Sequence, residues 1–182
     1  MSEREPARTQ WYIGAPNGVV LCVDRSNGGE LIGSFYHSYS REPVPFVGIG
    51  QMTLRMEKLY DYLQFPFPGT NSRSFGKVPP PQRKTHERIK VMTDNELLAK
   101  HGDIGTFIVR VQHRQNSTWQ GRVTWMEENK TVQFRSVWEM IKLIESAVDQ
   151  VSQPDTSEET IWFPEEDAAT SQEPGNEPEK KE

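Results

Sequence analysis

Alternating apolar and polar positions predict the same set of three strands twice along the chain. Within each run an apolar side chain recurs at every second position, which is the pattern of a strand with one buried face. The predicted strands cover residues 19–23, 31–35 and 44–46 in the first set and residues 107–111, 119–123 and 132–134 in the second.

A helix is predicted after each set, because the apolar spacing changes there to i, i+3, i+4 and i+7. The second helix follows Ser136, and Glu139 three residues later completes the pattern of a capping box. The first helix has Gly48 and Gly50 at the corresponding place, so its start lacks a polar cap. Between the two sets, residues 93–101 predict a further short helix, capped by Thr93 or Asp94 and stopped by Gly102.

The two sets align without a gap when residues 19–59 are laid on residues 107–147, an offset of 88. We interpret this register as an internal duplication; the alternative is two ordinary hairpins that each precede a helix. The predicted fold class is α+β, with two pseudo-repeated strand–hairpin–helix (βββα) units packed as one antiparallel-sheet domain. The predicted parts are 1–64, the first unit; 65–92, a Pro/Gly-rich basic linker; 93–151, the short helix and second unit; and 152–182, a disordered acidic tail.

Charge divides the chain into a basic body and an acidic tail. Residues 1–151 hold 19 Lys and Arg against 16 Asp and Glu, a balance of +3, whereas residues 152–182 hold 2 against 10, a balance of −8. The tail has too few apolar residues to offset the entropy of ordering, which predicts disorder. One aromatic island, Ile161-Trp162-Phe163, interrupts it. This island is a docking motif, a segment that packs on the parent domain, or a loosely tethered stretch.

The sequence contains no pattern of an enzyme or of a metal site. A P-loop, a dinucleotide-binding glycine motif and a nucleophile elbow are all absent, and the four histidines form no i,i+4 pair. The single cysteine, Cys22, leaves no intrachain disulfide and no Cys-rich zinc site. We therefore expect a protein that is not an enzyme and uses no cofactor. The lack of an export signal or a long apolar run predicts a cytoplasmic protein that does not enter membranes.

A polar surface is the best candidate site. If the valines of the second set face the core, the alternate positions form an opposite face that carries arginines and amides and no acid. This face contacts phosphates or an acidic partner, or it is an ordinary solvated face. Its predicted residues are Arg110, Gln112, Gln120 and Arg122, with Arg114 just beyond. Three further residues complete the candidate binding residues: Trp138, which lies off the apolar stripe of the second helix, and Lys84 and Arg88, which belong to a basic cluster in residues 73–90.

Residues 114–125 (RQNSTWQGRVTW) and 134–148 (FRSVWEMIKLIESAV) carry a specific pattern. It resembles a family of small uncharacterised proteins of anaerobic Gram-positive bacteria, with the pattern RQNxTWQG…W…FRSxxExIxLIxSA. The likeness covers much of residues 30–148. It implies no activity, because no function is known for that family.

Two further resemblances suggest ligands. Strands followed by one helix, repeated about a pseudo-dyad, are similar to the purine-rich-element-binding (PUR) fold, which holds single-stranded nucleic acid in units of four strands rather than three. Asn116-x-Thr118-x-x-Gly121 is similar to an element of PilZ cyclic-dinucleotide receptors, whose R-x-x-x-R motif Lys84-x-x-x-Arg88 approximates. Our first hypothesis is a non-catalytic binding or adaptor protein with a macromolecular partner, protein or nucleic acid. A single-stranded nucleic-acid binder is the second, and a cyclic-dinucleotide receptor ranks below both.

Overall fold

The computed structural model describes residues 13–84 and 88–152. These residues form six strands and three helices. The elements, in chain order, are β1 (Val19–Asn27), β2 (Glu30–His37), β3 (Val44–Val47), α1 (Gly48–Leu63), α2 (Asp94–Leu98), β4 (Gly105–Gln115), β5 (Thr118–Trp125), β6 (Lys130–Phe134) and α3 (Val137–Val151). The α+β class and the antiparallel sheet are as predicted; the tail beyond Ser152 lies outside the described residues.

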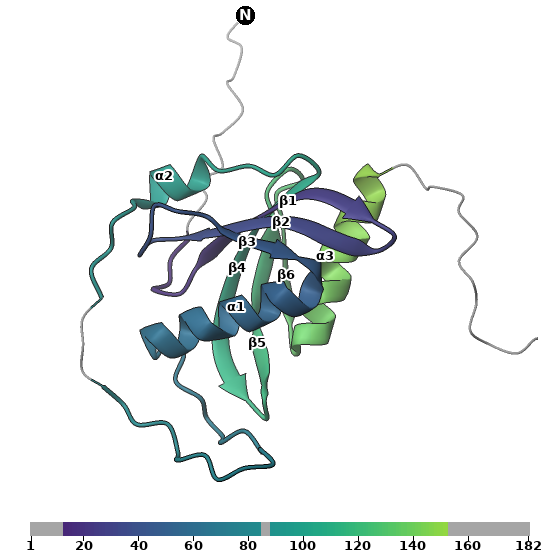
Figure 1. The fold of residues 1–182 in the computed structure, drawn as a ribbon. Coiled ribbons are helices and arrows are strands. Elements are labelled where there is room, and N and C mark those ends of the chain that lie inside the picture. The colour runs from purple at the N-terminus through teal and green to yellow at the C-terminus, as the bar shows by residue number, and fades with distance from the viewer. Residues whose placement is uncertain (1–12, 85–87, 153–182) are drawn as a thin grey trace, which may run out of the picture.

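One sheet contains all six strands, in the order β3-β2-β1-β4-β5-β6, and every neighbouring pair is antiparallel. The two long helices, blue α1 and green α3 in Figure 1, pack on the same face, α1 against β2 and β3 and α3 against β4, β5 and β6. We call this side the helix face and the opposite side the outer face. The main core lies between the helix face and the two helices.

The central pair β1–β4 joins the two halves, with Val20 opposite Ile108. Each half contains one irregularity, between Val23 and Arg25 in β1 and between Val111 and His113 in β4. These positions are 88 residues apart, as are the pairs Gly33–Phe46 and Gly121–Phe134, which join β2 to β3 and β5 to β6.

The helix starts follow the local sequence. Ser136 caps α3 by accepting a hydrogen bond from the backbone N–H of Glu139 at 3.1 Å. The carboxylate of Glu139 accepts from the backbone N–H of Arg135 at 2.6 Å rather than from Ser136, so the predicted capping box is only half formed. Thr93 caps α2 with a complete box, and α1 begins after Val47 without a side-chain cap.

A second, smaller core covers the outer face of β1. Ile13, Met92 and Leu97 pack there against Val20 and Cys22, which are buried. Helix α2, the segment before it and Ile13 therefore cover the outer face of β1. The outer face of β4 and β5 instead carries the polar side chains of the candidate site. Among the described residues, the helices are all too short or too polar to cross a bilayer.

Candidate binding surface

Two arginines lie directly opposite each other on the outer face of the sheet. Arg110 of β4 pairs in register with Arg122 of β5, and Arg122 in turn pairs with Gln133 of β6. Gln120 precedes Arg122 by two positions and so points to the same face, because side chains alternate along a strand. We call Arg110, Gln120, Arg122 and Gln133 the outer arginine face.

The polar groups of the outer arginine face have no partner within the part of the chain that the structure describes. Arg122 and Gln133 are exposed, and Arg110 and Gln120 are half-buried. Nε of Arg110 and Oε1 of Gln120 are both inaccessible and make no hydrogen bond to a described residue. Like charges directly opposite on neighbouring strands destabilise a sheet, and an unsatisfied buried group adds a desolvation cost. The arrangement therefore favours an anionic or hydrogen-bonding ligand on this face.

Arg114 does not belong to this face, and its predicted grouping with Arg110 and Arg122 was wrong. The irregularity between Val111 and His113 shifts the alternation by one residue, because a bulge places two residues opposite one. Gln112 is the extra residue, and it is exposed at the end of the outer arginine face. Arg114 is thereby turned to the helix face, where its side chain is only 4% exposed.

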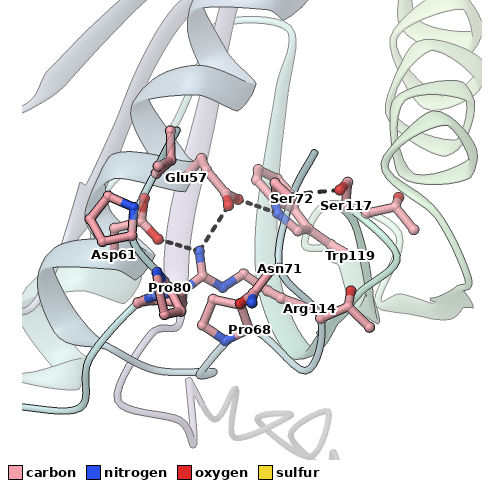
Figure 2. Close-up of a pocket in the computed structure, with 14 residues that line it drawn as sticks. Glu57, Asp61, Pro68, Asn71, Ser72, Pro80, Arg114, Ser117 and Trp119 are labelled. Atoms are coloured by element: carbon pink, nitrogen blue, oxygen red, sulfur yellow. Dashed lines mark hydrogen bonds and ion pairs between the residues drawn. The ribbon is translucent and has the colours of Figure 1, made fainter. Parts of the chain in front are cut away.

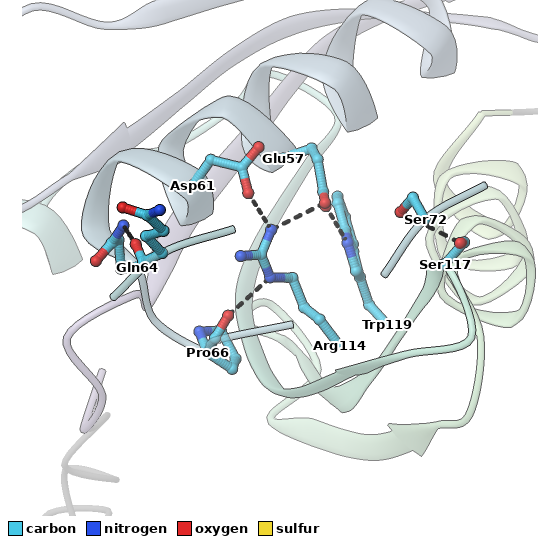
Figure 3. Close-up of polar contacts among 9 residues, drawn as sticks. Glu57, Asp61, Gln64, Pro66, Ser72, Arg114, Ser117 and Trp119 are labelled. Carbon is cyan, nitrogen blue, oxygen red and sulfur yellow. Dashed lines mark hydrogen bonds and ion pairs between the residues drawn. The ribbon is translucent and has the colours of Figure 1, made fainter. Parts of the chain in front are cut away.

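Three acceptors surround the guanidinium of Arg114. Nη1 donates to Oε1 of Glu57 at 2.9 Å and to Oδ1 of Asp61 at 2.7 Å, and Nε donates to the carbonyl of Pro66 at 2.8 Å (Figure 3). Glu57 also accepts a hydrogen bond from the indole Nε1 of Trp119. The two carboxylates lie one turn apart on α1, so the cluster ties this helix to the β4–β5 hairpin. Their i,i+4 spacing was visible in the sequence, but their partner was not.

A cleft of about 350 Å³ lies beside this cluster. Figure 2 shows Arg114 among the residues that line it, with Trp119, Ser72 and Ser117 to the right of the view and Pro80 to the left. The segment after α1 borders it and is bonded to the hairpin: the backbone N–H of Gly69 donates to the carbonyl of Arg114, and the backbone N–H of Asn116 donates to the hydroxyl of Thr70. Two carboxylates already neutralise Arg114, so the cleft is a poor site for an anion. The predicted linker is thus bound to the hairpin over these residues.

The remaining predicted residues lie at two other places. Trp138, at the start of α3, is 60% exposed, and Nζ of Lys142 lies 5.5 Å from its ring centroid. Arg88 donates to the carbonyl of Tyr62 at 3.1 Å and stacks on the Tyr62 ring at 4.0 Å, and Lys84 donates its backbone N–H to Gln64. The eight predicted residues therefore do not form one site. Arg110, Gln112, Gln120 and Arg122 lie together on the outer arginine face, whereas Lys84 and Arg114 line one pocket on the other side of the sheet.

The single cysteine, Cys22, is buried in the fold. Burial raises the pKa of the Cys22 thiol to about 12, and the nearby Asp24 and Glu127 carboxylates act in the same direction. The thiol is therefore protonated at neutral pH and is not a nucleophile. Burial likewise raises the pKa of Tyr60, whose ring packs edge-on against Trp119 at 5.2 Å. Clusters of three or more metal-ligating side chains are absent from the described residues.

Comparisons of the chain with protein-family models, with curated proteins and with solved structures found no match.

Proposed function

We propose that this chain is a non-catalytic binding protein whose macromolecular partner occupies the outer arginine face. The observation that carries the proposal is the pairing of Arg110 with Arg122 across β4 and β5, without a described carboxylate bonded to either. A carboxylate or phosphate placed between the two guanidinium groups would relieve their repulsion.

An acidic protein segment is the partner that the face suits best. Glutamine side chains flank the arginines on both β4 and β5, and amides of this kind bond the backbone of an extended peptide as well as its carboxylates. The four defining residues and Gln112 include no Trp, Tyr or Phe, and the one aromatic side chain paired with them is His113, opposite Gln120. Single-stranded nucleic-acid sites, in contrast, combine basic groups with aromatic platforms on which bases stack.

Single-stranded nucleic acid is the second candidate, because two unpaired arginines beside hydrogen-bonding amides also suit phosphates. The change of affinity with salt concentration shows whether phosphates are the groups that the face binds. Neutralisation of phosphates makes the affinity fall steeply with salt concentration. A PilZ-like cyclic-dinucleotide site has less support, because the guanidinium of Arg88 is bonded to Tyr62 and the backbone N–H of Asn116 to Thr70.

Fluorescence anisotropy with two labelled probes tests the proposal: a ten-residue glutamate peptide and a twenty-nucleotide oligo-dT, each at low and at moderate salt. The full chain and a chain ending at Ser152 are compared, since the acidic tail competes for a basic face. Binding of the peptide that Arg110→Gln/Arg122→Gln abolishes supports the first candidate; binding of oligo-dT alone supports the second. Arg25→Gln/Lys58→Gln removes the same charge elsewhere and is the matched control. Absence of binding by both probes at low salt would exclude both candidates.

We also infer that the two βββα units arose by duplication. The equal spacing of the two β irregularities and of the two glycine–phenylalanine pairs supports this inference. A duplicated unit predicts similar losses of stability from Gly33→Ala and from Gly121→Ala. A loss at only one of them would count against equivalent roles. The cytoplasmic location and the resemblance to the Gram-positive family remain predictions from the sequence.

A further inference from the structure

An apolar groove runs between the C-terminal half of α3 and the strands β5 and β6. Its volume is about 130 Å³. Val132, which we expected in the core, is 44% exposed at its edge, because β6 is the last strand of the sheet. The groove is lined by Phe107, Val123, Trp125, Val132, Leu143 and Ala147, with polar groups only at its rim.

The equivalent place beside α1 is closed by a polar side chain. Arg55, 88 residues before Leu143, donates a hydrogen bond to the carbonyl of Pro45 on β3 and so bridges the helix to the edge strand. Leu143 has no polar group with which to make such a bridge. The groove beside α3 is therefore left open by the described residues and offers an apolar surface to an aromatic or aliphatic group.

We propose that the chain's own aromatic island, Ile161-Trp162-Phe163, docks in this groove. The first argument is position: the chain leaves α3 at Val151, and the adjacent Gln150 lines the groove. The ten residues that lead from Ser152 to Trp162 span up to roughly 33 Å. The whole of α3 is only about 22 Å long, so Trp162 reaches every point of the groove.

The second argument is size and chemistry. A cavity of about 150 Å³ accepts a benzene ring, so a groove of 130 Å³ suits a single aromatic side chain. The island holds all the large apolar side chains of residues 152–182; the other apolar residues there are Ala168 and Ala169. The island is thus the one segment of residues 152–182 that can bury large apolar side chains in this groove.

Charge around the groove is mixed, so apolar contact rather than ion pairing drives the docking. Lys130 lies at the rim and attracts the glutamates that flank the island, but Glu128 lies 3.5 Å from its Nζ. From α3, Glu145 and Asp149 repel those glutamates. Docking should accordingly depend only weakly on salt. The groove is on the helix face, so this inference is independent of the outer arginine face and of the proposed function.

Disulfide trapping in the full chain tests the inference. Ser146→Cys at the exposed rim of the groove is combined with Thr160→Cys beside the island, and the control pair is Leu54→Cys, 66% exposed on α1, with Thr160→Cys. Cys22 is buried and stays in place. We expect the groove pair to close an intramolecular disulfide at least about tenfold faster than the control pair, because docking raises the effective concentration of the two thiols.

Trp162→Ala/Phe163→Ala in the groove pair provides a second readout, since these changes leave all the described residues as they are. We expect the rate of disulfide formation to fall to that of the control pair. Equal rates for the groove and control pairs would overturn the proposal. So would a disulfide that forms only between chains, because the occupant would then be a second copy, and so would a fast rate that the double alanine variant leaves unchanged.

Discussion

Asp61 of α1 accepts a hydrogen bond of 2.7 Å from Arg114 of β4, across a separation of 53 residues. The guanidinium is buried, whereas the Asp61 side chain is 61% exposed and that of Glu57 is 42% exposed. The ion pairs thus connect a desolvated cation to carboxylates that keep contact with water. Because α1 follows the first three strands and Arg114 precedes the β4–β5 turn, the cluster connects the two halves of the chain.

Replacing Arg114 should destabilise the protein more than replacing a surface arginine. Arg114→Gln removes both ion pairs and the bond to Pro66, and it leaves two carboxylates near each other on α1. Breaking a buried ion pair costs several kcal/mol, and the exposure of the carboxylates lowers our expectation to about 2–3 kcal/mol. Urea unfolding followed by circular dichroism measures this change.

Arg41→Gln is the matched control for Arg114→Gln. Arg41 pairs with Glu96 at 3.3 Å, and both side chains are well exposed, at 69% and 43%. An exposed pair contributes at most about 1 kcal/mol. Equal stability losses in the two variants would contradict a special role for the Arg114 cluster.

The misplacement of Arg114 shows where sequence patterns lose information. Strand alternation correctly predicted the helix-face core positions of β4 up to Val111. It did not predict that Val20 of β1 and Ile108 of β4 are buried on the outer face as well. The bulge after Val111 adds one residue to β4 and reverses the faces beyond it, and neither Gln112 nor His113 carries a sequence signal for a bulge.

Val132 shows a second limit, set by the end of the sheet. It alternates correctly, and yet it is 44% exposed, because β6 is the edge strand of the sheet that the described residues form. The apolar period predicts which face a residue occupies. It does not predict how far a neighbouring helix extends over that face, which depends on packing between distant segments.

Gly121 and Gly33 should be intolerant of a methyl group. A Cβ at Gly121 would lie 2.0 Å from the carbonyl oxygen of Arg110, and one at Gly33 would lie 2.0 Å from that of Cys22. Backbone must shift to relieve such a contact, so we expect Gly121→Ala and Gly33→Ala each to cost about 2–3 kcal/mol. Thermal and urea unfolding of both variants measure the loss.

Gly50→Ala is the control for the glycine variants. Gly50 lies in the first turn of α1, where a Cβ would meet no neighbouring atom within 4 Å. Because alanine has the higher helix propensity, Gly50→Ala should raise the free energy of unfolding by about 0.5–1 kcal/mol. A destabilised Gly50→Ala, or a neutral Gly121→Ala, would show that the packing around these strands differs from that described.

Cys22 should be unreactive in the folded protein. Burial raises the pKa of its thiol to about 12, so the thiolate is scarce at pH 8 and the sulfur is covered by the outer-face core. We expect its reaction with a chromogenic disulfide reagent to be slow until a denaturant is added. An exposed thiol in Ser146→Cys reports the rate of an accessible site, and a native Cys22 that reacts equally fast would disprove the burial.

The start of α3 should weaken in acid. Hydrogen bonds from the Arg135 side chain and backbone lower the pKa of the Glu139 carboxyl below its ordinary value of 4.5. A lowered folded-state pKa means that the contribution to stability is complete above the ordinary value and is lost as the pH falls through the folded-state value. NMR titration should show the Glu139 pKa rise towards the ordinary value in Arg135→Gln. An unchanged pKa in that variant would mean that the Arg135 side chain is not the cause.

Arg122→Glu should separate the stability of the sheet from binding on the outer arginine face. Arg122 lies opposite Arg110, so a glutamate there replaces a like-charge pair by an opposite-charge pair across β4 and β5. Cross-strand charge pairs contribute roughly 0.2–1 kcal/mol, and we expect a gain of about 0.5 kcal/mol in the free energy of unfolding. Affinity for an anionic probe should fall in the same variant, because the glutamate occupies Arg110. Arg122→Gln should lie between the wild type and Arg122→Glu in both measurements. A loss of stability in Arg122→Glu would mean that the arginines are not in conflict, and the reason for placing an anionic partner between them would disappear.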